Sequence, residues 1–394
     1  MDNGGRQILQ EHYQVIVVGA GPAGSAAARF CALSGLKTLI IEEHATPGYP
    51  VQCAGLLSIN AFQECEVSNE SIINTVYGAR IETESGHELI FRSKREKAHV
   101  VDRAILDIEM LRLAAEAGAD VRTKTIAWEI NSHEIKTIGI NGTASIEYDI
   151  LIAADGPRSR IRRLLNLNPP KTFIGGVQVE IPWKGEDDIV HIYPDSSPSF
   201  FGWVIPLSGN RARVGLCGVS GVPQLFKIFR LKFKDLSLHS VSGVIPLGVM
   251  NPTWKGRVLF VGDSAGFAKP TSGGGVYTGV RSARHAAFVA KECIEKSDYS
   301  ERAISRYESL WKKDIGHELA IGWQLFKMRG IVTQSELESI IISLNKEKNK
   351  QRIIENGDMD RPARLIASLL KDPEILAQSI CISLKYVANN LKIL

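Results

Sequence analysis

The sequence contains few cysteines, and their spacing excludes several kinds of site. Six occur in the 394 residues: Cys31, Cys53, Cys65, Cys217, Cys293 and Cys381. None belongs to a CxxC pair or to a Cys/His cluster with zinc spacing, so we expect no metal and no iron–sulfur cluster. The chain is also too long and too poor in cysteine for a disulfide scaffold. A reducing, cytoplasmic setting is the expectation.

Long apolar runs are missing as well. No stretch of about 18 apolar residues occurs, so no membrane-spanning helix is expected. Residues 1–14 are polar and do not resemble a signal peptide. We therefore predict a cytoplasmic protein that would reach a membrane lipid only as a peripheral protein on the inner face of the membrane.

Charge of one sign is not in large excess. The formal net charge is +4, and basic residues are spread along the chain apart from a run of arginines at 158–163. This balance does not indicate a nucleic-acid partner. The hydrophobic content of 44% and the charged content of 23% are those of a globular protein, and the length allows two or three structural units.

The N-terminal region has the pattern of a dinucleotide-binding βαβ unit. Residues 13–18 and 37–41 are short apolar strands, and residues 25–34 form an Ala-rich helix between them. The turn after the first strand reads Gly19-Ala20-Gly21-Pro22-Ala23-Gly24, which matches GxGxxG. Glu42 ends the second strand, about 20 residues further on. The glycines let the backbone approach a pyrophosphate, and the Glu42 carboxylate would accept hydrogen bonds from ribose and repel a 2′-phosphate.

Two later segments favour FAD over NAD. Asp155-Gly156 follows the apolar strand 149–153, and this segment resembles the Asp-Gly motif of flavoprotein hydroxylases. Residues 256–266 resemble the second FAD motif of the same group, in which Asp263 would bind the ribityl chain or ribose. Gly273-Gly274-Gly275 then precedes a helix from Val276. Its backbone N–H groups would face the pyrimidine edge of the flavin, and the helix dipole would stabilise the anionic reduced form.

The order of these patterns predicts an α/β protein with a β-rich insertion. We expect a Rossmann-like FAD-binding domain of the flavoprotein hydroxylase type, an antiparallel-sheet substrate domain and a helical C-terminal region. The predicted boundaries are 1–75, 99–171 and 250–299 for the FAD-binding domain, 76–98 and 172–249 for the substrate domain, and 300–394 for the helices. Residues 44–58 are expected to be an irregular loop, and a charged break is expected at 345–361.

Over roughly residues 13–330 the sequence resembles the geranylgeranyl reductase family, which includes archaeal digeranylgeranylglycerophospholipid reductases. The resemblance is carried by residues 17–26, the loop Pro50-Val51-Gln52-Cys53-Ala54-Gly55, residues 101–103, Asp155-Gly156, residues 201–206 and residues 262–276. It implies FAD contacts at Ala23, Glu42, Cys53, Ala54, Gly55, Arg103, Ala127, Asp263, Gly275 and Val276. It also implies saturation of isoprenoid C=C bonds, in geranylgeranyl chains of membrane ether-lipid precursors.

The family's substrate-pocket motif, YxWxFP, is only partly present. The segment reads Phe201-Gly202-Trp203-Val204-Ile205-Pro206, so Trp203 and Pro206 match while the Tyr and the Phe are replaced. By resemblance, Phe201, Trp203 and Pro206 would contact the substrate. An apolar aromatic strand suits a long hydrocarbon, and it equally suits an ordinary core strand.

Saturating an isolated alkene needs a hydride and a proton, and Cys53 is the candidate acid. An ordinary thiol is mostly protonated at neutral pH. The alternative is that Cys53 is a small packing residue beside the flavin. His285 is a second possible proton donor. An apolar stripe in the C-terminal region could dock on membrane or pack on the protein's own core. The stripe consists of Leu365, Ile366, Leu369, Leu370, Ile375, Leu376 and Ile380.

Three other functions share the FAD segments. A flavin monooxygenase of the hydroxylase type would use oxygen, a quinone-linked electron-transfer flavoprotein would usually carry an iron–sulfur cluster, and a prenyl-lipid carrier would keep FAD only as structure. The electron donor of a reductase is not determined by the sequence. Ferredoxin, coenzyme F420 and NAD(P)H all stay open, although the sequence has no second GxGxxG unit for a nicotinamide.

Overall fold

The computed structural model describes residues 11–233 and 239–391, so the predicted domain ends at residues 1 and 394 lie outside the described residues. Its first sheet has eight strands, with the order β17-β18-β11-β1-β2-β8 and with β10 and β9 continuing antiparallel from β11. The strands are β1 (Glu11–Val18), β2 (Thr38–Ile41), β8 (Asp120–Arg122), β9 (Ile126–Ile130), β10 (Glu134–Gly139), β11 (Gly142–Ala153), β17 (Trp254–Lys255) and β18 (Val258–Phe260). The four neighbouring pairs from β18 to β8 are parallel, so their carboxyl ends meet at one edge.

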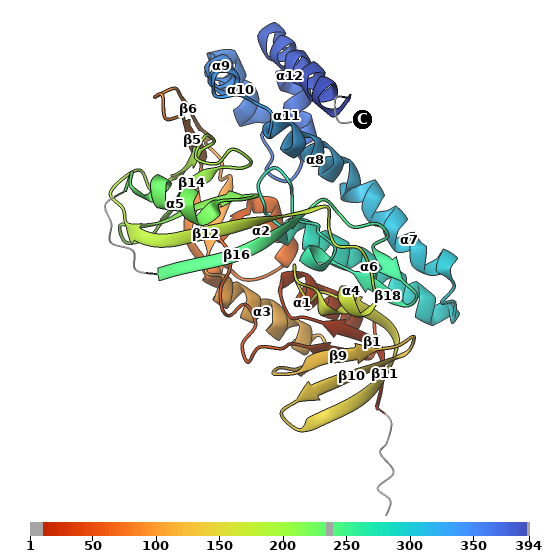
Figure 1. Ribbon diagram of the computed structural model, residues 1–394. Coiled ribbons are helices and arrows are strands. Elements are labelled where there is room, and N and C mark those ends of the chain that lie inside the picture. Colours follow the sequence, from red (N-terminus) through yellow and green to blue (C-terminus); the bar gives the residue numbers. More distant parts are fainter. Residues whose placement is uncertain (1–10, 234–238, 392–394) are drawn as a thin grey trace, which may run out of the picture.

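Helices α1 (Pro22–Leu33), α3 (Arg103–Glu116) and α6 (Val276–Lys296) pack with this sheet, in the lower half of Figure 1. Small residues let α1 and α6 approach closely. A Cβ atom at Gly279 on α6 would lie 3.3 Å from Cβ of Ala23 on α1. Strand β2 and the last four residues of β1 and of β11 are buried, almost continuous apolar runs, as expected for strands covered on both faces.

A second sheet of seven strands lies above the first in Figure 1. Its order is β16-β12-β15-β14-β13-β5-β6, and every neighbouring pair is antiparallel except β13 with β5. The strands are β5 (Gly78–Glu82), β6 (Glu88–Arg92), β12 (Thr172–Pro182), β13 (Ile189–Tyr193), β14 (Gly202–Leu207), β15 (Arg211–Gly218) and β16 (His239–Leu247). A three-stranded sheet, β3 (Leu56–Ser58), β7 (Ala98–Val101) and β4 (Ile72–Val76), completes the β structure of the described residues.

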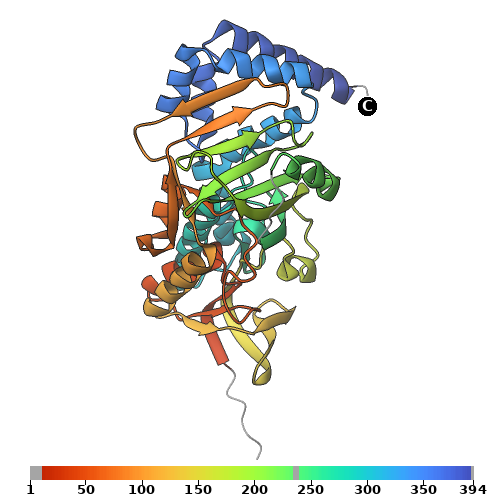
Figure 2. The same cartoon turned by 90° about the vertical axis from the view of Figure 1, so that its left-hand side faces the viewer.

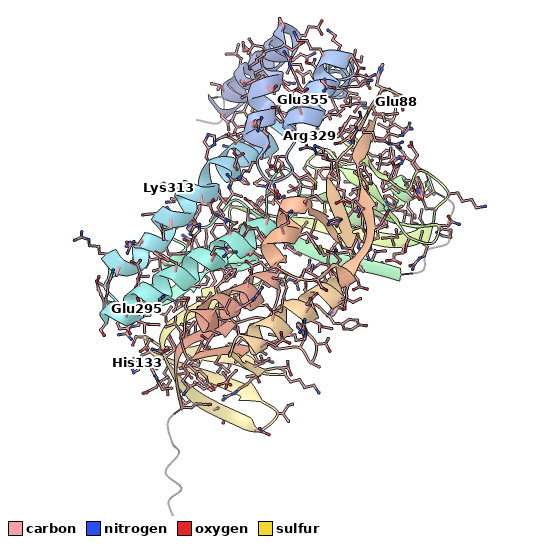
Figure 3. The ribbon with its side chains drawn as sticks, turned by 180° about the vertical axis from the view of Figure 1, so that it is seen from behind. Glu88, His133, Glu295, Lys313, Arg329 and Glu355 are labelled. Carbon is pink, nitrogen blue, oxygen red and sulfur yellow. The ribbon has the colours of Figure 1, made fainter. Side chains whose placement is uncertain are left out.

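The remaining helices lie mostly at the C-terminal end. They are α2 (Ile59–Cys65), α4 (Arg160–Leu164), α5 (Val222–Arg230), α7 (Glu301–Trp311), α8 (His317–Arg329), α9 (Gln334–Leu344), α10 (Glu347–Asn356), α11 (Pro362–Leu369) and α12 (Pro373–Leu391). Figure 2 shows α9–α12 as a cap over the edge of the second sheet. Figure 3 shows Arg329 of α8 where the helices meet this sheet, and its guanidinium donates to the carbonyl of Pro194 at 2.7 Å.

Several expectations need correction. Residues 44–58 are not irregular throughout, because Leu56–Ser58 pairs with β7 as strand β3. The charged break at 345–361 contains α10, whose Ile353 is buried against Leu89 and Ile341, so only 345–346 and 357–361 interrupt the helices. The first helix begins at Pro22, because proline is well accommodated in the first turn of a helix.

The apolar stripe of the C-terminal region is divided. Leu365 and Leu369 pack against the cluster around Ile341, and Ile375 is buried, whereas Leu376 and Ile380 are 42% and 51% exposed. Within residues 11–233 and 239–391, none of the helices combines the length and the apolar character that crossing a membrane requires.

Candidate active site

The glycine turn after β1 is shaped by contacts that only glycine allows. Gly19 has φ +99°, and a Cβ there would lie 2.4 Å from the carbonyl oxygen of Ala154. A Cβ at Gly24 would lie 1.9 Å from the oxygen of Gly19. At Gly21, by contrast, a Cβ would meet no atom within 4 Å. The first and last glycines of the motif therefore close the turn, and the middle one borders open space next to the start of α1.

Glu42 is held against this turn. Its side chain accepts a hydrogen bond from the Ala20 amide at 2.7 Å, and it also binds the backbone and ring nitrogens of His44 at 2.9 and 2.8 Å. Only 8% of Glu42 is exposed. The carboxylate thus fixes the glycine turn from the end of β2, and its predicted contact with ribose stays a prediction.

The Asp-Gly segment meets the turn from the neighbouring strand. Oδ2 of Asp155 accepts hydrogen bonds from the amides of Arg160 and Ile161 at 2.7 and 3.0 Å, while Oδ1 is buried without a partner. Burial raises the pKa of Asp155, and the hydrogen bonds oppose that rise. Gly156 follows with φ +72°. The free acceptor Oδ1 and the open space at Gly21 suit a polar ligand such as a dinucleotide.

The third segment joins the other two after β18. A Cβ at Gly262 would lie 2.8 Å from Cβ of Ala23, and the Ser264 hydroxyl donates to the Ala153 carbonyl at 2.7 Å. Arg162 of α4 donates to the Ser264 carbonyl at 2.9 Å. These contacts bring the glycine turn, the Asp-Gly segment and the segment of Asp263 to one edge of the first sheet, at the carboxyl ends of its strands.

Asp263 lies beside the start of α6. A Cβ at Gly275 would lie 2.8 Å from Oδ1 of Asp263. Burial raises the pKa of Asp263 to about 6, and the positive charge of Arg103 lowers it in part. Gly274 and Val276 flank Gly275, and Val276 is the first residue of α6. A buried carboxylate and helix N–H groups therefore border the same place.

Arg103 links Asp263 to Cys53. It begins α3, and its guanidinium binds both oxygens of Asp107 at 2.9 Å. Burial lowers the pKa of Arg103, but the charge of Asp107 and the nearby sulfur of Cys53 outweigh burial and raise it. Sequence reasoning found Arg103 by resemblance and missed Asp107, although its i,i+4 spacing from Arg103 is a local signal that could have found it.

The loop of Cys53 is fastened to the second sheet by two side chains. The Gly55 amide donates to Sγ of Cys53 at 3.3 Å, and the Gln178 side chain of β12 donates to the Cys53 carbonyl at 3.0 Å. Arg213 of β15 donates to the Ala54 carbonyl at 2.9 Å. Gly55 has φ +73°, and a Cβ there would lie 2.4 Å from the Arg213 guanidinium. Gln178 and Arg213 were missed by sequence reasoning, because no local pattern marks contacts over more than 100 residues.

The aromatic segment around β14 forms a continuous cluster. Phe201 stacks on Phe200 with ring centroids 4.5 Å apart and meets Trp203 edge to face at 6.2 Å. Trp203 packs with Ala54 in one apolar cluster and with Phe201 in another, and its indole Nε1 is buried without a partner. Pro206 lies at the far end of β14, where its carbonyl accepts from Asn74 at 3.1 Å. Phe201 and Trp203 thus share a region with the Cys53 loop.

Two candidates remain. Ala127 is buried in β9, where it pairs with Thr137. It lies two residues after Thr125, whose amide donates to the Glu42 carbonyl at 2.8 Å. His285 lies on α6 nine residues after Val276, about 14 Å along the helix, and its Nε2 is 2.9 Å from Asp314. Among the described residues, no group of three or more His, Cys, Asp or Glu side chains is arranged to hold a metal ion.

Comparisons with known proteins agree on one family. A model of the FAD binding domain matches residues 12–221. Digeranylgeranylglycerophospholipid reductase 2 of Methanothermobacter thermautotrophicus is 32% identical over 84% of this chain and 91% of its own length. The reductase of Thermoplasma acidophilum is 30% identical over the same shares of the two chains.

Solved structures confirm the fold. A crystal structure described as a geranylgeranyl bacteriochlorophyll reductase-like protein of Thermoplasma acidophilum has a TM-score of 0.86 and 27% identity, covering 95% of this chain and 100% of that one. A flavin-dependent brominase has a TM-score of 0.72 at 14% identity, covering 96% of this chain and 100% of its own, and shares the fold alone. The predicted FAD-binding fold of the flavoprotein hydroxylase type and the FAD cofactor are therefore confirmed.

Proposed function

Because the chain belongs to the digeranylgeranylglycerophospholipid reductase family of FAD-dependent flavoproteins, we propose that it saturates C=C bonds in the geranylgeranyl chains of membrane ether-lipid precursors. The observation that carries the proposal is the position of Cys53. The Gly55 amide donates to its sulfur, the charge of Arg103 lies nearby, and Gln178 of the second sheet donates to its backbone carbonyl. A thiol held in this loop, next to the sheet that would receive the substrate, would serve an alkene reductase as a proton donor.

Saturation of one double bond consumes a hydride and a proton. FAD held at this site would supply the hydride, with two electrons and a proton coming from an external reductant. The Cys53 thiol would give its hydrogen as a proton to the other alkene carbon, and the Arg103 guanidinium lies near the sulfur that is left. Solvent returns the proton to the sulfur. Arg103 is fixed for this task by its two hydrogen bonds to Asp107.

The cofactor would be held by the three segments that meet at the sheet edge. Gly19, Gly21 and Gly24 form the turn for the pyrophosphate, and Asp155 and Asp263 offer carboxylates to sugar hydroxyls. Phe201 and Trp203 would border the isoprenoid chain, because aromatic rings beside the Cys53 loop offer an apolar surface to a hydrocarbon. Leu376 and Ile380 on α12 would give a peripheral protein an apolar contact with the lipid phase.

The test compares Cys53→Ala with Cys381→Ala, because Cys381 is exposed on α12 and remote in sequence from every proposed FAD segment. Each protein is reduced without oxygen, mixed with a geranylgeranyl ether lipid and followed by flavin reoxidation and by the lipid's mass spectrum. Cys53→Ala should stay yellow with FAD and lose alkene reduction by about 100-fold or more, the usual contribution of a general acid. The control should behave as the unmodified protein.

Full activity of Cys53→Ala would remove Cys53 from the mechanism. Rapid oxygen consumption that hydroxylates a substrate, with no change at the double bonds, would establish the monooxygenase alternative instead. Protein that stays colourless after incubation with FAD would overturn the assignment of the site.

A further inference from the structure

We propose that Lys269 is a charged positioning residue that raises the redox potential of the bound flavin, and that Asp360 of the C-terminal helical region moderates its effect. This inference rests on the proposed function, in which Gly274 and Gly275 receive the pyrimidine edge of the flavin. Nothing in the sequence motifs indicates the pair, because the two residues lie 91 positions apart.

The Lys269 side chain runs directly behind Gly274. The loop is closed by its own backbone, since the Lys269 amide donates to the Gly274 carbonyl at 3.0 Å and the Gly273 amide donates to the Lys269 carbonyl at 2.8 Å. A Cβ atom at Gly274 would lie 3.3 Å from Cε and 3.6 Å from Nζ of Lys269. The ammonium group therefore lies next to Gly274, one of the residues whose amides are proposed to face the flavin.

Asp360 holds the ammonium through one carboxylate oxygen. Its Oδ1 lies 2.5 Å from Nζ of Lys269, and its Oδ2 accepts a hydrogen bond from the hydroxyl of Ser58. Nζ also donates to the Met359 carbonyl at 3.0 Å. Lys269 and Asp360 are 7% and 2% exposed, so water screens the pair little. The loop between α10 and α11 thus reaches two segments that border the proposed flavin site, namely residues 262–275 and the end of the Cys53 loop.

The positive member of the pair is the one nearer Gly274. Two of the three atoms nearest to the position that a Gly274 Cβ would occupy belong to Lys269 and the third is Oγ of Ser272, whereas no Asp360 atom is among them. When FAD takes up two electrons and one proton, the reduced ring carries a negative charge at its pyrimidine end. A nearby ammonium stabilises that charge, and the more distant carboxylate reduces the benefit. Asp263 and Arg103 also contribute to the local field, and both are unchanged in the variants below.

The experiment measures the midpoint potential of FAD-loaded protein by stepwise chemical reduction against a reference dye. Lys269→Met should shift the equilibrium toward oxidised flavin by about tenfold, which equals about 30 mV for a two-electron couple. Asp360→Asn should shift it in the opposite direction. Lys269→Arg keeps the charge and should keep the potential, and Ser58→Ala should leave the potential unchanged because it removes no charge.

A merely structural pair would give a different pattern, in which every variant weakens FAD binding and the potential does not move. Since Asp360→Asn leaves a buried ammonium unpaired and destabilises the loop, the double variant Lys269→Met with Asp360→Leu replaces the ion pair by apolar groups that pack without charge. It should fold and show a lowered potential. This proposal alone is overturned if Lys269→Met and the double variant both keep the midpoint potential of the unmodified protein. The proposed function is overturned if none of the proteins, the unmodified one included, binds FAD.

Discussion

Both carboxylate oxygens of Asp107 accept hydrogen bonds from the guanidinium of Arg103, one turn earlier on α3, at N–O distances of 2.9 Å. The Asp107 side chain is 2% exposed and the Arg103 side chain 13%. Arg103 in turn faces Cys53 and Asp263. One helical ion pair therefore orients a cation whose charge lowers the pKa of the proposed sugar-binding carboxylate, Asp263.

Asp107→Asn should destabilise the protein, because it leaves the buried guanidinium of Arg103 without its bidentate partner. Breaking a buried pair in this way costs about 3 kcal/mol or more in the free energy of unfolding. Glu116→Gln is the matched control on the same helix, where Arg112 and Glu116 form an exposed pair that should contribute less than about 1 kcal/mol. Urea denaturation of the FAD-free proteins measures both, and equal losses would contradict the role given to burial.

Gly24→Ala and Gly21→Ala should separate folding from cofactor binding. At Gly24 the new methyl group would lie 1.9 Å from the Gly19 carbonyl oxygen, so the turn must open at a cost of about 3 kcal/mol or more. At Gly21 it meets no protein atom, and φ is −68°, so the FAD-free protein should keep its stability. FAD affinity, measured by quenching of flavin fluorescence, should nevertheless fall in Gly21→Ala. Unchanged affinity there would place the pyrophosphate elsewhere.

Trp203→Phe should cost less stability than Trp311→Phe. Both changes remove the same atoms from an apolar cluster. The indole Nε1 of Trp311 donates to the Thr253 hydroxyl at 2.9 Å, whereas that of Trp203 is buried without a partner. Trp311→Phe loses a hydrogen bond, whereas Trp203→Phe removes a buried donor that has no partner. The free energies of unfolding of the two variants should therefore differ by about 2 kcal/mol. A larger loss for Trp203→Phe would show that its Nε1 is satisfied in solution.

The sequence predicted the local parts of the fold because each has a local physical signal. The turn Gly19 to Gly24, the apolar strands around it and Asp155-Gly156 are all marked by glycine geometry or by strand periodicity within a few residues. The helix α10 was missed because residues 347–352 are highly charged and suggest a break, although Glu, Lys, Gln and Arg are good helix formers. The packing of Ile353 on Leu89 holds this helix against the second sheet, and that contact has no local signal.

Contacts between distant segments were the other feature of the site that could not be predicted from the sequence. Gln178 and Arg213 reach the Cys53 loop from strands more than 100 residues away, and Asp360 reaches Lys269 over 91 residues. Their residue types are ordinary for surface loops and strands. Only the folded chain shows that Lys269 and Asp360 are buried together, and the roles of all these residues stay proposals.

Asp263 offers a test in which stability and function change in opposite directions. Burial raises its pKa from 3.8 to about 6 in the FAD-free protein. Because the folded pKa lies above the unfolded one, folding favours the protonated acid. The contribution of Asp263 to stability is complete below about pH 3.8 and is lost as the pH rises through about 6. The difference of roughly two units corresponds to about 3 kcal/mol at pH 8.

Asp263→Asn should therefore make the FAD-free protein more stable at pH 8, by up to about 3 kcal/mol, and change it little at pH 4. The same change should weaken FAD binding about 10- to 100-fold at pH 8, because an amide accepts sugar hydroxyls less strongly than a carboxylate. Urea denaturation at both pH values and FAD titration at pH 8 measure the two effects. Asp187→Asn, at an exposed position, should change neither by more than about 0.5 kcal/mol. If Asp263→Asn is instead less stable than the unmodified protein at pH 8 without FAD, the surroundings stabilise the buried carboxylate. The cost of burial would then be excluded as the reason for the raised pKa of Asp263.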